Sequence, residues 1–126
     1  MITKVAIAGA AGRMGRRLIA RAHDLDEVEV VSVLSRRGNL DGLEPQVVNT
    51  SDPHEAFEAS EVVIDFTAPA ACMSLLETAE ARKVAYVLGS TGLSESQLAA
   101  VHERAKNIAV LVASNFSVGV NLLFEL

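Results

Sequence analysis

The chain has 126 residues, of which 50% are hydrophobic and 21% are charged, a composition typical of a globular domain and too apolar for disorder. Its net charge of −5 and sequence pI near 5.1 argue against nucleic-acid and anionic-membrane partners, because both select a basic surface. No apolar run approaches the roughly 18 residues of a membrane span, and the N-terminus has no signal-peptide pattern. The single cysteine, Cys72, fits a reducing cytoplasm, and we expect it to fill core space on a helix.

Five short runs rich in valine and isoleucine predict β-strands. Their successive positions are mostly apolar rather than alternating, which is the pattern of strands buried on both faces of a parallel sheet. These runs cover residues 5–8, 28–34, 62–66, 84–88 and 108–113, and a weaker sixth candidate surrounds residues 46–48.

Amphipathic helices are predicted between these strands. After the first strand, apolar residues recur at helical spacing over positions 14–25. A short second helix is expected after Asp52, an N-cap residue followed by a first-turn proline and by Glu55 as the capping-box partner.

Two longer helical patterns follow in the second half of the chain. One is an apolar stripe over positions 72–79, and the other begins with Ser94 and Gln97, which form a capping box. Strands that alternate with helices predict right-handed βαβ crossovers. The sequence therefore predicts an α/β fold with a doubly wound parallel sheet, a Rossmann-type dinucleotide-binding domain, in one domain over residues 1–126.

The first predicted strand runs directly into a glycine turn with the spacing G-x-x-G-x-x-G. A strand before it and an amphipathic helix after it are the context in which such a turn binds a dinucleotide diphosphate. One glycine permits the turn, a second lets the main chain approach the diphosphate, and a third lets the helix pack on the strand. The alternative is a tight strand-to-helix turn without a ligand. The candidate diphosphate contacts are Gly9, Ala10, Ala11, Gly12, Arg13 and Met14.

The end of the second predicted strand indicates which cofactor is preferred. The dinucleotide fingerprint places an acidic residue about 20 positions after the glycines, where it binds the adenosine ribose hydroxyls. This chain has Ser35, Arg36 and Arg37 there instead. Because guanidinium groups pair with phosphate through charge-assisted hydrogen bonds, we expect NADPH to be preferred, with NADH possible. The alternative is a solvated pair of surface arginines.

Three later segments follow predicted strands at their carboxyl ends, where open α/β sheets bind ligands. Their sequences are DFT from Asp65, GSTG from Gly89 and ASNFSVGVN from Ala113. Together with the glycine turn, AGAAGRMG from Ala8, these segments resemble the 4-hydroxy-tetrahydrodipicolinate reductase family of bacterial lysine biosynthesis, also called dihydrodipicolinate reductase. The resemblance covers essentially the whole chain, and NFSVGVN is its most specific part.

The resemblance implies a role for each of these segments. Ser35 stands where many members carry a glutamate for the ribose, while Arg36 matches an arginine used for the NADP phosphate. Phe66 and Thr67 are implied to line the nicotinamide pocket. The cofactor loop would comprise Gly89, Ser90 and Thr91, with serine replacing the family's first threonine. The segment that would close over the nicotinamide comprises Ala113, Ser114, Asn115 and Phe116.

The part of these enzymes that binds the substrate is not within these 126 residues. In this family a substrate domain follows the NFSVGVN segment, supplies the proton donors and a Ser-Gly-Thr loop for the substrate carboxylates, and builds a homotetramer. We therefore expect no catalytic residue in this segment. It should bind NADPH without reducing the cyclic dicarboxylate substrate, since hydride transfer requires the substrate to be held against the nicotinamide. We also expect the segment to be monomeric, and its apolar end after Ser117 to continue in a longer, tetrameric protein.

Other polar residues are set aside as candidates for chemistry. The three histidines are scattered, so we expect no metal site. Asp65 ends a buried strand, and we expect it to orient a loop rather than to act as a general acid or base. Tyr86 lacks the lysine that follows the catalytic tyrosine of short-chain dehydrogenases.

Two other functions remain open at this point. The first is a free-standing regulatory module that senses NADP(H), and the abrupt apolar end of the chain argues against it. The second is a Rossmann enzyme with another substrate, such as an aspartate or homoserine dehydrogenase, and the NFSVG segment argues against it.

Overall fold

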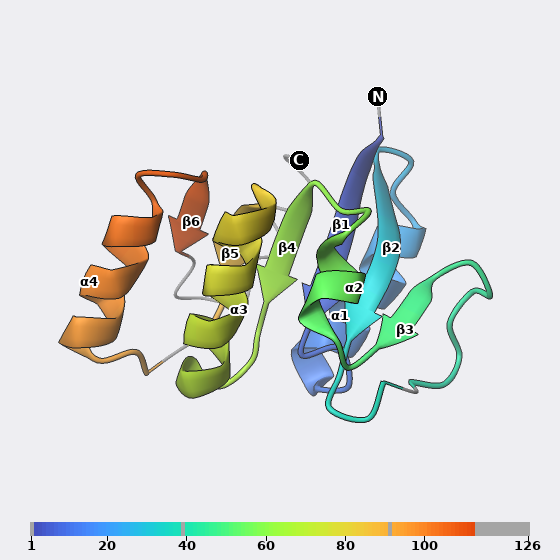
Figure 1. Ribbon diagram of the computed structural model, residues 1–126. Coiled ribbons are helices and arrows are strands. Elements are labelled where there is room, and N and C mark those ends of the chain that lie inside the picture. The colour runs from blue at the N-terminus through green and yellow to red at the C-terminus, as the bar shows by residue number, and fades with distance from the viewer. Residues whose placement is uncertain (1, 39, 91, 113–126) are drawn as a thin grey trace.

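In the part of the chain that the computed structural model describes, six parallel strands form one sheet, in the order β3-β2-β1-β4-β5-β6 (Figure 1). This is the doubly wound strand order of dinucleotide-binding domains, so the predicted fold class is confirmed. The structure describes residues 2–38, 40–90 and 92–112. The strands are β1 (Thr3–Ala8), β2 (Val28–Leu34), β3 (Val48–Thr50), β4 (Val62–Asp65), β5 (Ala85–Leu88) and β6 (Val110–Val112).

Among the described residues, four helices cover the two faces of the sheet. They are α1 (Arg13–His23), α2 (Pro53–Phe57), α3 (Pro69–Arg82) and α4 (Glu95–Arg104). Helix α1 packs on one face, where Leu18 and Ala22 join a buried cluster with Val5 and Ile7 of β1. Helices α2, α3 and α4 lie together on the other face, in front of the sheet in Figure 1. In the part of the chain described here, no helix is long and apolar enough to cross a membrane.

The helix ends confirm one predicted cap and correct another. Ser94 and Gln97 form the expected reciprocal capping box at the start of α4. At the start of α2 the side chain of Asp52 accepts a hydrogen bond from the amide of His54, as an N-cap should. The expected role of Glu55 is wrong, because the amide of Asp52 donates instead to the hydroxyl of Thr50 at 3.0 Å. The preceding strand places that hydroxyl within reach, so the glutamate is not needed.

The contact between α1 and the end of β1 depends on a glycine. A Cβ atom at Gly15 would lie 2.5 Å from the carbonyl oxygen of Gly9 and 2.7 Å from the Cα atom of Ala10. Both neighbours are main-chain atoms and cannot move aside as the end of a side chain can. The third glycine of the turn therefore sets how closely the helix approaches the strand, as the sequence predicted.

We predict that Gly15→Ala lowers the free energy of unfolding by about 1–3 kcal/mol, because overpacking here pushes the helix from the strand. The matched control is Gly12→Ala in the same turn. Gly12 has a φ of −75°, and a Cβ there would make only an ordinary 3.4 Å contact. Gly12→Ala should lower the free energy of unfolding by less than about 1 kcal/mol, because alanine is a weaker N-cap residue than glycine. Urea titration measures both, and equal losses would contradict the proposed packing role of Gly15.

Candidate functional site

The carboxyl ends of four strands lie in one row across the sheet. Ala8 of β1 pairs with Leu34 of β2 on one side and with Asp65 of β4 on the other, and Asp65 pairs with Leu88 of β5. The four segments that leave this row therefore start side by side along one edge. They begin at Gly9, Ser35, Phe66 and Gly89. The strand order reverses between β1 and β4, which is where open α/β sheets bind ligands.

The glycine turn is pressed against the loop that follows β4. Gly9 has a φ of +80°, which favours glycine, and a Cβ there would lie 3.2 Å from the carbonyl carbon of Phe66 and 3.3 Å from the amide nitrogen of Thr67. The amides of Gly9 and Ala10 both donate to the carbonyl of Leu34, at 3.1 and 3.3 Å. These two amides are therefore engaged within the protein, and the turn contributes to the site through close approach.

The N-terminus of α1 has the properties of an anion site. No side chain caps Gly12, the N-cap residue, and the first turn has no acidic residue. The first helical hydrogen bond runs from the amide of Arg16 to the carbonyl of Gly12 at 3.0 Å. The amides of Arg13, Met14 and Gly15 precede it, at the positive end of the helix dipole. An uncapped helix end reached through glycines fits the diphosphate of a dinucleotide.

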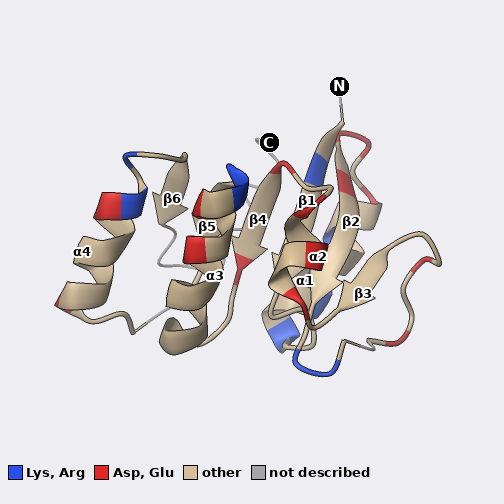
Figure 2. Ribbon diagram, viewed as in Figure 1, with Lys and Arg blue, Asp and Glu red and all other residues tan. Residues whose placement is uncertain are grey.

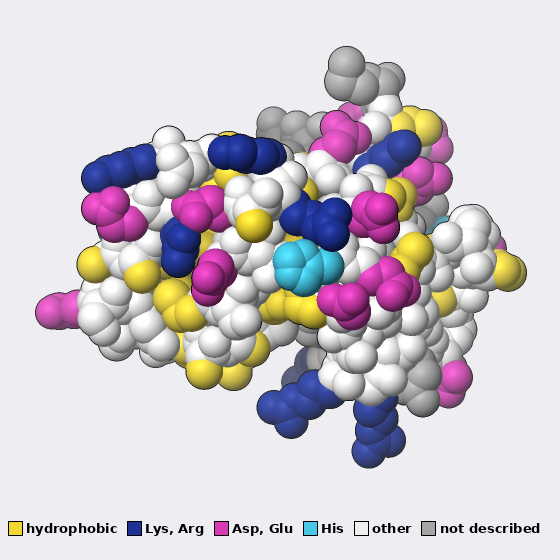
Figure 3. Space-filling view, viewed as in Figure 1, with side chains coloured by type: hydrophobic (Ala, Val, Ile, Leu, Met, Phe, Trp, Pro, Cys, Tyr) yellow, Lys and Arg dark blue, Asp and Glu magenta, His cyan; other side chains and the backbone are white. Residues whose placement is uncertain are grey.

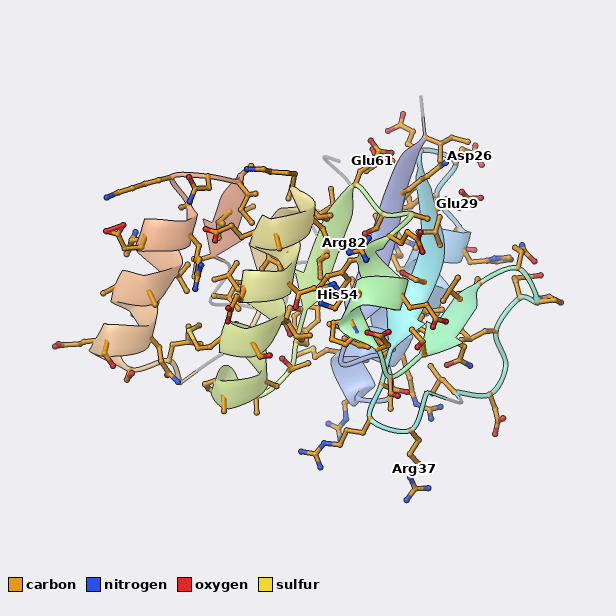
Figure 4. The ribbon with its side chains drawn as sticks, viewed as in Figure 1. Asp26, Glu29, Arg37, His54, Glu61 and Arg82 are labelled. Carbon is orange, nitrogen blue, oxygen red and sulfur yellow. The ribbon has the colours of Figure 1, made fainter. Side chains whose placement is uncertain are left out.

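The turn after β2 presents its two arginines to solvent. The hydroxyl of Ser35 accepts a hydrogen bond from the amide of Gly38 at 3.1 Å, which closes the turn, and the amide of Ser35 donates to the carbonyl of Thr50 at 3.1 Å. Arg36 and Arg37 are exposed. Figure 2 shows this basic turn at the lower edge of the molecule, and Figure 4 shows Arg37 pointing away from the protein body. Both guanidinium groups are thus accessible to a phosphate.

A buried carboxylate lies beneath the loop that follows β4. Asp65 is 0% exposed, and one of its oxygens accepts hydrogen bonds from the amide and the hydroxyl of Thr67, at 2.7 and 2.6 Å. Its other oxygen accepts a hydrogen bond from the hydroxyl of Tyr86. Burial, followed by the charge of Asp65, raises the pKa of the Cys72 thiol to about 12, and the same two causes raise the pKa of Tyr86. Asp65 thus orients a loop, as predicted, and Cys72 is a core residue of α3, as predicted.

The loop that follows β5 completes this edge. A Cβ at Gly89 would collide with the ring of Phe66, so only glycine lets that ring lie over the end of β5. The hydroxyl of Ser90 donates to the carbonyl of Thr67 at 2.5 Å. The loops after β4 and β5 therefore form one connected surface beside the glycine turn.

Two hollows lie away from this edge. One, of about 400 Å³, lies between α2 and α3 and is lined by His54 and Arg82, which Figure 4 labels on the front face. Figure 3 shows a histidine beside a basic side chain on the same face. The other, of about 1090 Å³, lies between α1, β2 and the segment around Leu43. Neither contains a residue of the glycine turn. The candidate site is accordingly an open edge made of turns. Among the residues described, no group of three or more His, Cys, Asp or Glu side chains is arranged to hold a metal.

Comparison with known proteins assigns this arrangement to a family. The family model described as the N-terminus of dihydrodipicolinate reductase matches residues 3–116. The chain belongs to this family. The match includes the glycine turn, the arginine turn and the loops after β4 and β5. Membership supports a nicotinamide dinucleotide as the cofactor of the site, in its phosphorylated or unphosphorylated form.

Curated relatives and a solved structure agree with this assignment. The chain is 38% identical over 135 residues to 4-hydroxy-tetrahydrodipicolinate reductase of Ruegeria pomeroyi and 40% identical over 136 residues to that of Alkalilimnicola ehrlichii. These matches cover 99% and 100% of this chain but 50% and 51% of the relatives, so the chain spans about half of their length. The dipicolinate-bound dihydrodipicolinate reductase of Paenisporosarcina sp. TG-14 has the same fold, with a TM-score of 0.81, 24% identity and coverage of 97% of this chain and 51% of that one.

A more distant structure shows how far the fold itself extends. Homoserine dehydrogenase of S. aureus superposes with a TM-score of 0.69 at 15% identity, over 89% of this chain and 32% of that one. At that identity the likeness concerns the fold alone. Membership of the dihydrodipicolinate reductase family therefore decides against the homoserine dehydrogenase alternative, which the fold would have allowed.

Most of the candidate residues named from the sequence lie along the strand-end edge. Five others fall outside the described residues, namely Thr91, Ala113, Ser114, Asn115 and Phe116. Sequence reasoning missed the bond between Tyr86 and Asp65. The available signal was a polar residue in each of two otherwise apolar strand runs, but the partnership becomes visible only when β4 and β5 are paired.

We predict that the protein loses stability at alkaline pH through this buried network. An acid whose pKa is higher in the folded protein stays protonated there while the unfolded chain releases its proton. The stabilisation is thus complete below the unfolded pKa values, 9.0 for cysteine and 10.0 for tyrosine, and declines as the pH rises above them. The free energy of unfolding from urea titrations should fall above about pH 9.

Tyr86 is the only tyrosine, and the chain has no tryptophan, so tyrosinate absorbance reports on this residue alone. Absorbance at the tyrosinate band should increase only when the protein unfolds, and Tyr86→Phe should flatten the decline above about pH 10. A tyrosinate signal that titrates near pH 10 in the folded protein would contradict the raised pKa.

Proposed function

We propose that this chain is the NADPH-binding part of a 4-hydroxy-tetrahydrodipicolinate reductase. The observation that carries the proposal is the single row of strand ends, Leu34, Ala8, Asp65 and Leu88, from which four candidate cofactor segments leave side by side. A dinucleotide laid along this edge would place its diphosphate at the N-terminus of α1. Its adenosine ribose would lie at the Ser35–Arg37 turn and its nicotinamide beside the Phe66 and Gly89 loops.

The individual contacts follow from the chemistry of each segment. The first-turn amides of α1, together with Gly9 and Gly12, accommodate the diphosphate. The exposed guanidinium groups of Arg36 and Arg37 bind the 2′-phosphate. Phe66, Thr67, Gly89 and Ser90 contact the nicotinamide, and Thr91 with residues 113–116 completes that end.

In the whole protein, NADPH would donate its hydride to 4-hydroxy-tetrahydrodipicolinate in the diaminopimelate route to lysine. This part of the proposal is supported by the relatives, which are named for that reductase and are about twice as long as this chain. The same support favours a reductase over a free-standing sensor of NADP(H). We further propose a homotetramer as the full-length assembly and the cytoplasm as its location, in keeping with the free, buried thiol of Cys72.

Residues 1–126 alone are predicted to bind NADPH and to reduce no substrate, because they carry the candidate cofactor loops while the family's substrate domain, which would orient the dicarboxylate, is not within them. NADPH fluorescence titration tests binding, and a reductase assay with 4-hydroxy-tetrahydrodipicolinate tests turnover. Light scattering on the same sample should show a monomer. Appreciable turnover by this segment would contradict the proposal that residues 1–126 bind the cofactor without reducing the substrate.

NADPH should bind more tightly than NADH, by roughly 1.5–3 kcal/mol for a charge-assisted contact, or about tenfold to a hundredfold. Arg36→Ala should remove most of this preference and leave NADH affinity nearly unchanged. Ser35→Glu should reverse it, because a carboxylate binds the ribose hydroxyls and repels the phosphate.

The matched control is Arg82→Ala, which removes an exposed arginine at the end of α3, away from the strand-end edge (Figure 4). It should leave both affinities unchanged. Calorimetric titration at low and moderate salt measures all four proteins. Equal dissociation constants for NADPH and NADH in the unmodified chain would show that Arg36 and Arg37 are only surface charge.

A further inference from the structure

Thr67 is held by hydrogen bonds to its amide, its hydroxyl and its carbonyl. Asp65 accepts hydrogen bonds from the amide at 2.7 Å and from the hydroxyl at 2.6 Å, and the hydroxyl of Ser90 donates to the carbonyl at 2.5 Å. Thr67 is nevertheless half-buried rather than enclosed. It lies at the edge of the sheet against Gly9, where the candidate cofactor site begins. Three hydrogen bonds therefore fix Thr67, although it lies in a loop at the edge of the sheet.

The carboxylate that holds Thr67 is itself held from below. The hydroxyl of Tyr86 in β5, a residue that is 1% exposed, donates a hydrogen bond to the second oxygen of Asp65. Cys72 of α3 belongs to the same buried cluster as Tyr86, and burial, followed by the charge of Asp65, raises the pKa of its thiol. No buried side-chain nitrogen or oxygen in the described part of the chain lacks a partner. Rotation of the carboxylate would therefore break bonds in a region that water does not reach, and the orientation of Asp65 is fixed.

This network is more than the fold needs. The other members of the strand-end row, Ala8, Leu34 and Leu88, are apolar and pair in the sheet without a buried charge. A buried carboxylate costs free energy unless it is fully hydrogen-bonded, and an apolar residue of similar size often serves stability as well or better. Asp65 and Tyr86 add a defined orientation of the Phe66–Thr67 loop. This loop contacts both the glycine turn and the loop after β5.

We propose that Asp65 and Tyr86 are positioning residues for the nicotinamide end of the cofactor, because they fix the Phe66–Thr67 loop against Gly9 and Gly89. This inference rests on the proposed cofactor site. The two residues act through Thr67 and lie below the surface, so they contact no part of the ligand themselves. Their removal should weaken only those interactions that the nicotinamide makes, and leave the adenosine and phosphate contacts at α1 and Arg36 intact.

The test compares two ligands on the same protein by calorimetric titration. NADPH occupies the whole site, while 2′,5′-ADP carries the adenosine and the 2′-phosphate but no nicotinamide. Tyr86→Phe removes one hydroxyl and keeps the ring in the core. We expect it to lower the affinity for NADPH on the order of tenfold, the loss of one hydrogen bond to a charged group, with an affinity for 2′,5′-ADP within about twofold of the unmodified chain.

The matched control is Ser32→Ala, which deletes another buried hydroxyl, one that donates to the carbonyl of Ala56 in α2 and does not contact Asp65 or Thr67 in any hydrogen bond of the described residues. It should lower the melting temperature without changing the ratio of the two affinities. Where Tyr86→Phe does not fold, Asp65→Asn is the second variant. Its amide keeps an oxygen for Thr67 but is a weaker, neutral acceptor, so a smaller loss confined to NADPH is expected.

Three results separate the possibilities. A selective loss of NADPH affinity in Tyr86→Phe or Asp65→Asn supports the positioning role. An unchanged ratio of NADPH to 2′,5′-ADP affinities in the folded variants would overturn it, and would leave the cofactor site itself standing. Failure of the unmodified chain to bind either ligand would overturn the proposed function and this inference together.

Discussion

The candidate site depends on the position of β1 between β2 and β4. Its last residue, Ala8, pairs with Leu34 on one side and with Asp65 on the other. The hydrogen bonds between neighbouring strands continue one residue beyond these pairs. The amide of Gly9 donates to Leu34, and the amide of Phe66 donates to Ala8. A shift of one residue in either pairing would turn every side chain of a strand to the opposite face. Val5 and Ile7 of β1 pack in one buried cluster and Ala6 and Ala8 in the other, so the shift would place each set against the wrong neighbours. The glycine turn and the arginine turn are adjacent because of this register.

Glycines at this edge allow neighbouring segments to approach more closely than a Cβ atom would permit. At Gly15 and Gly9 the space for a Cβ is taken by the backbone of the turn and of the Phe66–Thr67 loop, and at Gly89 it is taken by the ring of Phe66. Three elements therefore meet more closely than side chains would allow. No side chain caps the N-terminus of α1 at this edge, and an uncapped helix N-terminus is what a diphosphate site requires.

The charge of the molecule is distributed so that an acidic protein can present a basic edge. The chain carries a net charge of −5, yet Asp26, Glu29 and Glu61 lie near the amino ends of the strands, opposite Arg37 at the carboxyl ends (Figure 4). Exposed charges are screened over a Debye length of about 8 Å at physiological salt. A phosphate at the basic turn after β2 therefore experiences the nearby guanidinium groups far more than the distant carboxylates. The net charge argues against a nucleic-acid surface and is compatible with a phosphorylated cofactor.

What the sequence determined by itself was local in origin. Uninterrupted apolar runs mark strands buried on both faces, helical spacing marks the helices, and the glycine turn between β1 and α1 marks the candidate ligand edge. The arginines at the end of β2 could be placed as well, since their position depends only on where that strand stops. The third glycine could be assigned its packing role for the same reason.

Other features were decided only by the tertiary structure, because they join residues from separate elements. The hydrogen bond from Tyr86 to Asp65 requires β5 to pair with β4 in one particular register. The hydrogen bond from Ser90 to the carbonyl of Thr67 requires the loops after these two strands to lie together. No periodicity along the chain encodes such contacts. A buried polar group must find its partner in three dimensions, and only the pairing of the strands determines which partner is within reach.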